Sequence, residues 1–149
     1  MRPYVALLMA SMCGGTVPAL AGMYTDDLSR CLVDSSTKED RTALVQWIFA
    51  AISQNPSIAA YSKATDADIE KANAAVGSLF MRLLTETCVD KARKAVKYEG
   101  AVAIQGAFEV LGKVASSDLF SDPKVQAVMA ALGKHVDNKK LEALKDAEP

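Results

Sequence analysis

Apolar residues recur at helical spacing along most of the chain, and strand-like alternation of apolar and polar residues is largely absent. Leu28, Cys31 and Leu32 lie at positions i, i+3 and i+4, which places them on one apolar helix face. This spacing predicts a first helix over residues 26–33, with Thr25 as its N-cap.

A second helix is predicted over residues 38–53, after a turn that ends in a capping-box pattern formed by Ser36 and Glu39. The segment ALVQWIFAAI within this helix is apolar on almost every side except at Gln46. A helix of this composition is usually central to the core, so we expect Trp47 to pack inside. The helix is expected to end at Asn55-Pro56.

A long third helix is predicted over residues 66–98, straight or bent, beginning at the capping pair Thr65 and Asp68. Gly100 is the expected C-cap. The alternative is a break near residues 85–87. The apolar stripe of this helix comprises Ile69, Ala72, Val76, Leu79, Phe80, Leu83, Leu84, Cys88, Ala92 and Val96.

Two further helices are predicted nearer the C-terminus. One spans about 101–116, where Gly106 and Gly112 allow close approach of a neighbouring helix. The other begins at Asp122-Pro123, a capping residue followed by proline at the first helical position. Its apolar residues at helical spacing are Val125, Val128, Met129, Leu132 and Val136.

These elements predict an all-α fold: a compact bundle of about five helices around one long central helix. We expect three regions, a leader over 1–21, a helical domain over 22–136 and a charged C-terminal tail over 137–149.

The segment 1–21 has the features of a cleavable bacterial secretory signal. Arg2 gives a positive start, an apolar stretch follows, and Ala19-Leu20-Ala21 matches the small-x-small rule before a cleavage site. The apolar stretch is far shorter than the roughly 20 residues needed to span a bilayer, so we expect no membrane span. Lipoprotein processing at Cys13 is the alternative, although Met12 is a poor fit before a lipidated cysteine. The expected location is the periplasm or the exterior.

Three cysteines occur, and Cys13 would leave with the leader. The remaining even pair in an oxidising compartment predicts a disulfide between Cys31 and Cys88. A redox or metal-binding role is disfavoured because neither a C-x-x-C motif nor a nearby histidine accompanies them.

The chain has 17 basic and 18 acidic side chains, which gives no general attraction to nucleic acid or to an anionic membrane. The densest charge cluster is basic, comprising Lys91, Arg93, Lys94 and Lys97 near the end of the long predicted helix. Helix-dipole compensation accounts for it, and contact with an acidic partner is the functional alternative.

The sequence offers few groups for catalysis and predicts no catalytic residue, metal site or cofactor. Its one histidine, His135, lies near a predicted helix end, where the dipole favours a cation. Most other carboxylates match helix starts. Glu86 and Glu109 could form a glycosidase-like acid pair, but no pattern in the sequence favours it.

Arg82, Tyr98 and Glu99 form the predicted partner-contact patch, because arginine and tyrosine are frequent interface anchors. The sequence therefore predicts a non-enzymatic, exported protein-interaction domain of the inhibitor, immunity or adaptor type, with a protein partner in the cell envelope. The alternatives are a binder of a small apolar ligand, in a pocket among the second, third and fourth helices, and an enzyme.

Overall fold

The computed structural model describes residues 22–143, so the predicted leader and Cys13 lie outside the described residues. The described part is helical and contains no strand. Its helical elements are α1 (Met23–Ser35), α2 (Lys38–Ile52), α3 (Pro56–Ala59), α4 (Asp66–Arg82), the π-turn η1 (Leu83–Thr87), α5 (Val89–Glu99), α6 (Val102–Phe120), α7 (Pro123–Ala131), the 3-10 turn η2 (Leu132–His135) and α8 (Asn138–Glu142).

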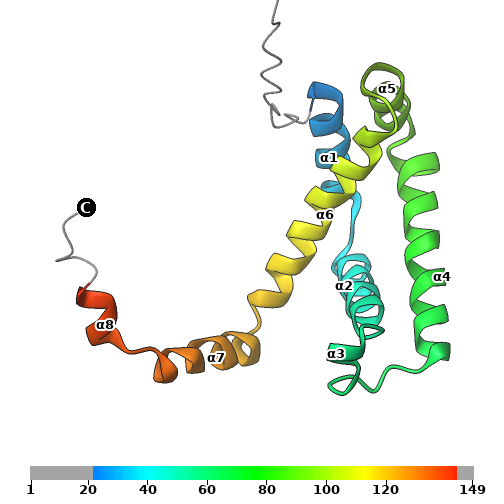
Figure 1. Ribbon diagram of the computed structural model, residues 1–149. Helices are drawn as coiled ribbons and strands as arrows, with labels where there is room; N and C mark the ends of the chain where they lie inside the picture. The colour runs from blue at the N-terminus through cyan, green and yellow to red at the C-terminus, as the bar shows by residue number, and fades with distance from the viewer. Residues whose placement is uncertain (1–21, 144–149) are drawn as a thin grey trace, which may run out of the picture.

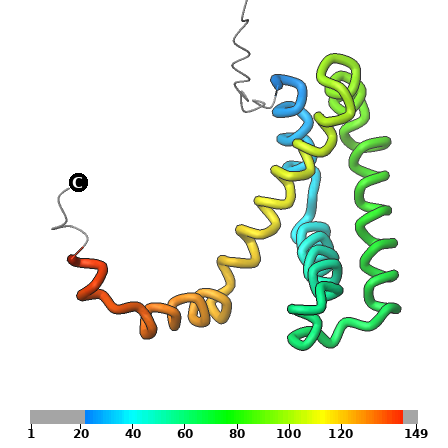
Figure 2. The backbone as a smooth tube through the Cα atoms, in the orientation of Figure 1, coloured from blue at the N-terminus to red at the C-terminus, as the bar shows by residue number. Residues whose placement is uncertain are grey.

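The bundle is built around α6, which runs from α5 past α1 and on to α2 (Figures 1 and 2). One half packs α1 against α5 and α6, and the other half packs α2 against α4 and α6. The all-α bundle predicted from the sequence is therefore confirmed. The core consists of small and medium apolar residues: Leu28, Leu32, Leu44, Val76, Leu79, Leu83, Cys88, Ala92, Ala95, Ala103, Ala107, Leu111 and Ala115.

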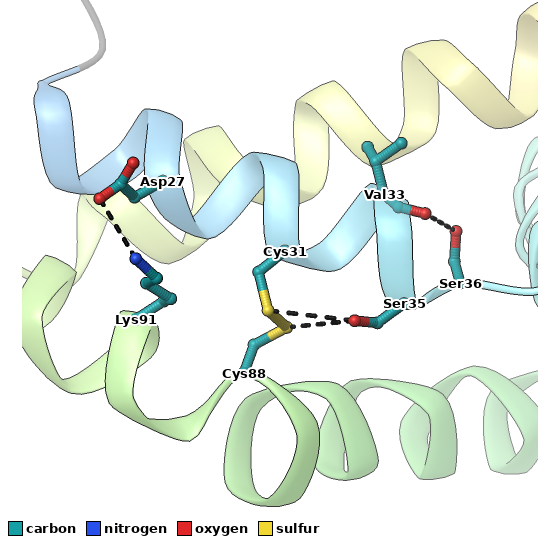
Figure 3. The surroundings of a disulfide bond; sticks show 7 residues. All are labelled: Asp27, Cys31, Val33, Ser35, Ser36, Cys88 and Lys91. Carbon is teal, nitrogen blue, oxygen red and sulfur yellow. Dashed lines mark hydrogen bonds and ion pairs between the residues drawn. A yellow bond between two sulfur atoms is a disulfide. The ribbon is translucent and has the colours of Figure 1, made fainter.

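The predicted disulfide between Cys31 and Cys88 is present, with a Cα–Cα distance of 6.0 Å (Figure 3). It joins the middle of α1 to the residue just before α5. Ser35 lies beside it, with Oγ 3.9 Å from the Cys88 sulfur, and Lys91 pairs with Asp27 at 3.5 Å. The bridge and this ion pair fix α5 along α1.

The long third helix is interrupted, so the break considered as the alternative is the observed structure. The amide of Cys88 donates to the carbonyl of Leu83 at 2.8 Å, a π-type bond that spans five residues instead of four. The widened turn places Cys88 where its sulfur meets Cys31. Periodicity alone missed the break because the apolar stripe continues through it in the sequence.

Two predicted N-caps are wrong. The helix α1 begins at Met23, and Gly22 rather than Thr25 precedes it, without a side-chain cap of its own. The capping box of α2 is formed by Thr37 and Asp40, one residue later than the predicted Ser36 and Glu39. Both pairs have the three-residue spacing of a capping box. The Ser36 hydroxyl does not cap α2, because it donates to the Val33 carbonyl at 2.8 Å. By contrast, the predicted capping pair at the start of α4 is confirmed.

The predicted core helix α2 packs against the core through Leu44 and the partly buried Trp47, but it is less buried than its composition suggests. Only Leu44 and Ala50 are buried, whereas Phe49 and Ile52 are 51% and 48% exposed. Trp47 is half-buried, and its indole N–H donates to the side-chain oxygen of Asn73 at 2.9 Å. Near the start of α2, Arg41 pairs with Asp118 of α6 at 2.6 Å.

The helices after α6 extend away from the bundle (Figure 1). Asp122 and Pro123 begin α7 as predicted. A Cβ at Gly106 would lie 3.2 Å from the Thr25 methyl group, so α1 approaches closely there as expected, whereas a Cβ at Gly112 would meet nothing within 4 Å, so the expected close approach is absent at that position. The predicted fifth helix is shorter than its apolar stripe, because α7 ends at Ala131, Leu132 lies in the 3-10 turn η2, and Val136 is extended. No residue of α7 or η2 is buried, so the stripe does not enter the core. A short helix, α8, forms within the predicted charged tail.

Candidate protein-binding surface

The α5 groove is an open apolar depression of about 540 Å³ along one flank of α5 and the adjoining π-turn. Val89, Arg93 and Val96 follow one another at positions i, i+4 and i+7, which places them on the same flank of the helix. Val96 is 45% exposed, although it continues the stripe predicted to be buried. The groove is lined by Leu84, Thr85, Val89, Ala92, Arg93, Val96 and Lys97.

The groove has an apolar floor and a basic edge. Of the cations on α5, Lys91 is held by Asp27 of α1, as described above. Arg93 makes only a long, exposed contact of 3.8 Å with Asp90, and Lys97 lies 5.0 Å from the centre of the Tyr98 ring. Exposed pairs of this kind contribute little stability, so Arg93 and Lys97 can be redirected toward a partner's carboxylates.

Glu99, one of the predicted contact residues, instead holds the start of α1. Its carboxylate accepts hydrogen bonds from the backbone N–H groups of Tyr24 and Thr25, both at 2.9 Å, and from the Thr25 hydroxyl at 2.6 Å. These N–H groups belong to the first turn of a helix, where they lack intrahelical partners and favour a negative charge. The cap therefore comes from a residue 74 positions away from Thr25.

The absence of a side chain at Gly22 makes room for this cap, because a Cβ there would overlap the Glu99 carboxylate. The hydrogen bond from the Thr25 hydroxyl lowers the pKa of Glu99 most strongly. Desolvation is the next largest effect and raises this pKa, and the backbone N–H groups of Tyr24 and Thr25 lower it further. The pKa of Glu99 thus lies below its ordinary value of 4.5.

We expect Glu99→Gln to lower the melting temperature at neutral pH, because the amide lacks the charge that stabilises the first turn of α1. The pKa of Glu99 is lower in the folded than in the unfolded chain. Its contribution is therefore complete above pH 4.5 and is lost as the pH falls through the folded-state pKa. Thermal unfolding over a pH series should show the melting temperatures of wild type and variant converging in acid. A constant difference would contradict the role of the charge.

Arg82, the second predicted contact residue, bridges α4 and α2. Its guanidinium donates to the carboxylate of Asp40 at 2.7 Å, and that carboxylate also accepts from the Thr37 backbone at 2.8 Å. Partial burial raises the pKa of Asp40, but the Thr37 N–H and the Arg82 guanidinium outweigh it, so this pKa is lowered. Arg82 thereby ties the start of α2 to the end of α4.

Tyr98 remains the most accessible of the predicted contact residues, at 57% exposure. Its ring stacks on Tyr24 with centroids 4.8 Å apart. Tyr98 and Glu99 are thus brought together against the start of α1, whereas Arg82 lies at the α2–α4 junction. Lys97 contacts the Tyr98 ring and also lines the α5 groove, so Tyr98 lies beside the candidate surface.

The α2–α4 groove is a second apolar depression, of about 670 Å³, where the second half of α2 faces the first half of α4. Leu119, near the end of α6, closes one side. Its polar edge is formed by Lys63, Asp68 and Lys71. The rest of the lining is mainly apolar and comprises Ala43, Val45, Gln46, Phe49, Ala50, Ala64, Ala72 and Ala75.

The α5 groove is not among the sites predicted from the sequence, whereas the α2–α4 groove lies among the helices expected, in the alternative interpretation, to enclose a ligand pocket. The sequence does contain a signal for the α5 groove, because Val89 and Val96 alternate with Arg93 and Lys97 on the same predicted helix. The helical spacing of Val96, however, is equally that of a buried core residue, and burial was the prediction. A π-turn rotates the residues that follow it around the helix axis, relative to a regular α-helix. The helical periodicity of the sequence therefore does not indicate which flank of α5 is exposed.

The groups considered for catalysis lie on three different elements: Glu86 in η1, Glu109 in α6 and His135 in η2. Glu86 and Glu109 are both exposed, so neither lies in the apolar site that a glycosidase-like acid requires, and Glu109 accepts from Gln105 at 3.1 Å. His135 is exposed in η2. Over residues 22–143, no group of three or more histidine, cysteine or acidic side chains is placed to hold a metal ion.

In the same range, no helix combines the length and apolar character needed to cross a membrane. Comparison of the chain with models of protein families, with curated proteins and with solved structures found no match.

Proposed function

We propose that this protein is an exported, non-enzymatic protein-interaction domain that binds a partner in the bacterial cell envelope along the α5 groove. The observation that carries the proposal is the combination of an exposed apolar floor with two weakly engaged cations, Arg93 and Lys97, on a helix held in place by a disulfide. Such a rigid, partly apolar surface suits an inhibitor, an immunity protein or an adaptor.

The groove suits an amphipathic helix with acidic residues beside its apolar face. An apolar stripe at positions i, i+3, i+4 and i+7 would lie against Val89 and Val96, which is the usual geometry of a helix in a groove. Carboxylates flanking that stripe would meet Arg93 and Lys97. Because these cations lie at the edge, they favour rapid and selective association more than affinity.

The disulfide supports export, because such bridges persist mainly in oxidising compartments. The leader predicted over residues 1–21 agrees with that location but lies outside the described residues.

Photocrosslinking in cells that export the protein tests this proposal. A photoreactive phenylalanine analogue at Val96 should yield one discrete adduct with a different protein, identified by mass spectrometry. The matched control is the same analogue at Asp34, which is exposed on α1 and lines neither groove. Reversal of the edge charges with Arg93→Glu and Lys97→Glu should abolish the adduct formed from Val96.

Absence of an adduct from Val96, or equal adducts from Val96 and Asp34, would overturn the α5 groove as the binding surface. An adduct of two copies of this chain would show self-association instead of a distinct partner. Folding of each variant is verified by its circular dichroism spectrum before the comparison is made.

A small apolar ligand is the second candidate, and the α2–α4 groove favours it. Its volume of about 670 Å³ falls within the range of small-molecule sites, which is roughly 300–1,000 Å³. Native mass spectrometry of the purified protein would reveal a retained ligand as a discrete added mass. A Phe49→Ala variant should lose that mass, because Phe49 lines the groove.

A further inference from the structure

The Glu99 carboxylate carries a negative charge that no lysine or arginine of the described bundle neutralises. None of the ion pairs formed within residues 22–143 includes Glu99. Its hydrogen bonds from Tyr24 and Thr25 hold it in the ionised form, and the side chain is half-buried at the start of α1. A partly buried charge is costly unless it is paired, so this carboxylate points to a cation of another origin.

One oxygen of this carboxylate can accept a further hydrogen bond beside Gly22. Oε2 accepts two, from the backbone N–H and the hydroxyl of Thr25. Among the described contacts, Oε1 accepts one, from the Tyr24 N–H. Each carboxylate oxygen has two lone pairs, so Oε1 retains an acceptor position. Oε1 is also the atom nearest to the Cβ position of Gly22.

Gly22 is fixed with its nitrogen close to Oε1. Its carbonyl accepts the first backbone hydrogen bond of α1, from the Asp26 N–H at 3.0 Å. A Cβ on Gly22 would overlap Oε1, and the nitrogen is bonded to the same Cα. The nitrogen therefore lies within about 5 Å of Oε1. Opposite charges at this range stabilise each other.

Glycine is required at position 22 by this contact and not by the backbone. Its φ of −71° and ψ of 168° are extended values that any residue adopts. The missing side chain serves instead to bring the main chain against the Glu99 carboxylate, one of the uses that only glycine permits.

The predicted leader ends immediately before this contact, at Ala21. Hydrolysis of the Ala21–Gly22 bond adds one water molecule: Ala21 leaves with a carboxylate, and the nitrogen of Gly22 becomes an ammonium. This ammonium has three donors and stays protonated at neutral pH. A cation at the start of a helix is unfavourable by itself, because it opposes the helix dipole. A carboxylate beside it removes that penalty.

We infer that Glu99 is the binding site for the processed amino terminus of this chain: cleavage between Ala21 and Gly22 creates an ammonium that pairs with Oε1 of Glu99. The ion pair joins the start of α1 to the end of α5 and forms only after the leader is removed. This inference rests on the proposed export but not on the α5 groove.

Protein purified after export tests the inference. The matched control carries a serine inserted between Ala21 and Gly22, which leaves Ala19-Leu20-Ala21 before the cut and moves the ammonium by one residue, about 3.8 Å. Intact mass spectrometry should show that wild type begins at Gly22 and the control at the added serine. Each form is prepared with and without Glu99→Gln.

The rate at which the terminal amino group reacts with acetic anhydride at neutral pH measures the pairing. Only the neutral amine reacts, and the carboxylate holds the ammonium protonated, so Glu99→Gln should accelerate labelling about two- to five-fold in wild type. The same substitution should not change the rate in the control with inserted serine. Thr25→Val removes one hydrogen bond of the cap but keeps the carboxylate, so it should not accelerate labelling either.

The other outcomes overturn the inference. A retained leader would overturn both the pairing and the proposed export, and a mature chain that begins at another residue would overturn the pairing alone. Equal labelling of wild type and Glu99→Gln would leave Glu99 as a helix cap only. An equal acceleration in the control with inserted serine, or by Thr25→Val, would mean the same. Absence of an adduct from Val96 would overturn the α5 groove without affecting this result. Circular dichroism verifies that each variant is folded.

Discussion

Cys31→Ser is expected to lower the free energy of unfolding by about 4 kcal/mol, because the bridge closes a loop of 57 residues in the unfolded chain. For a domain of this size, a loss of that magnitude corresponds to a fall in melting temperature of roughly 10–20 °C. Thermal unfolding followed by circular dichroism measures the change directly.

A reducing agent supplies the matched control for this prediction. It should lower the melting temperature of wild type to that of the variant and should leave the double variant Cys31→Ser, Cys88→Ser unchanged. A wild-type melting temperature that is insensitive to reduction would show that the bridge does not contribute to stability.

Leu111→Ala is expected to destabilise the protein by about 2–5 kcal/mol, because Leu111 is fully buried and truncation leaves a cavity. The residue lies in the core on α6, the helix that contacts both halves of the bundle. A cavity there should therefore weaken the whole domain in one cooperative transition. Urea denaturation gives the free energy of unfolding from the midpoint and slope.

Val102→Ala, at the start of the same helix, is the control for Leu111→Ala. Val102 is 69% exposed, so its truncation should change the free energy of unfolding by no more than about 0.5 kcal/mol. Equal losses from the two variants would contradict the position of α6 at the centre of the core.

Helix starts with short-range signals were predictable from the sequence. Thr65 with Asp68, and Asp122 with Pro123, satisfy the helix ends within their own segments, so spacing alone identifies them. The positive φ of Gly100, at 82°, similarly agrees with its predicted role after α5. The disulfide was predictable because only two cysteines remain once the leader is set aside.

The cap of α1 was not predictable in the same way. It depends on Glu99, and no local spacing links that residue to Tyr24 or Thr25. The sequence alone groups Glu99 with Arg82 and Tyr98 in the predicted partner-contact patch, because arginine and tyrosine are frequent interface anchors. Tertiary structure therefore assigned the carboxylate to a helix end instead.

The exposed surfaces were missed for a related reason. Helical periodicity identifies an apolar stripe, but it does not say whether a neighbouring helix covers it. Phe49 on α2 and Val128 on α7 have the same spacing as core residues, yet both are exposed, and α7 extends away from the bundle. Which face of a helix is covered depends on the neighbouring helices, and a single-sequence pattern does not contain that information.

The π-turn has a consequence for how this chain can vary in length. Relative to a regular helix, its extra residue rotates everything that follows by about 100° around the helix axis. Deleting one residue from 83–87 would restore a continuous helix but would turn Cys88 away from α1 and bury a different side of α5. Glu86 and Thr87 are exposed and line neither groove, so their identities can change freely. The number of residues in the π-turn cannot change, because the Cys31–Cys88 disulfide and the exposure of Val96 both depend on it.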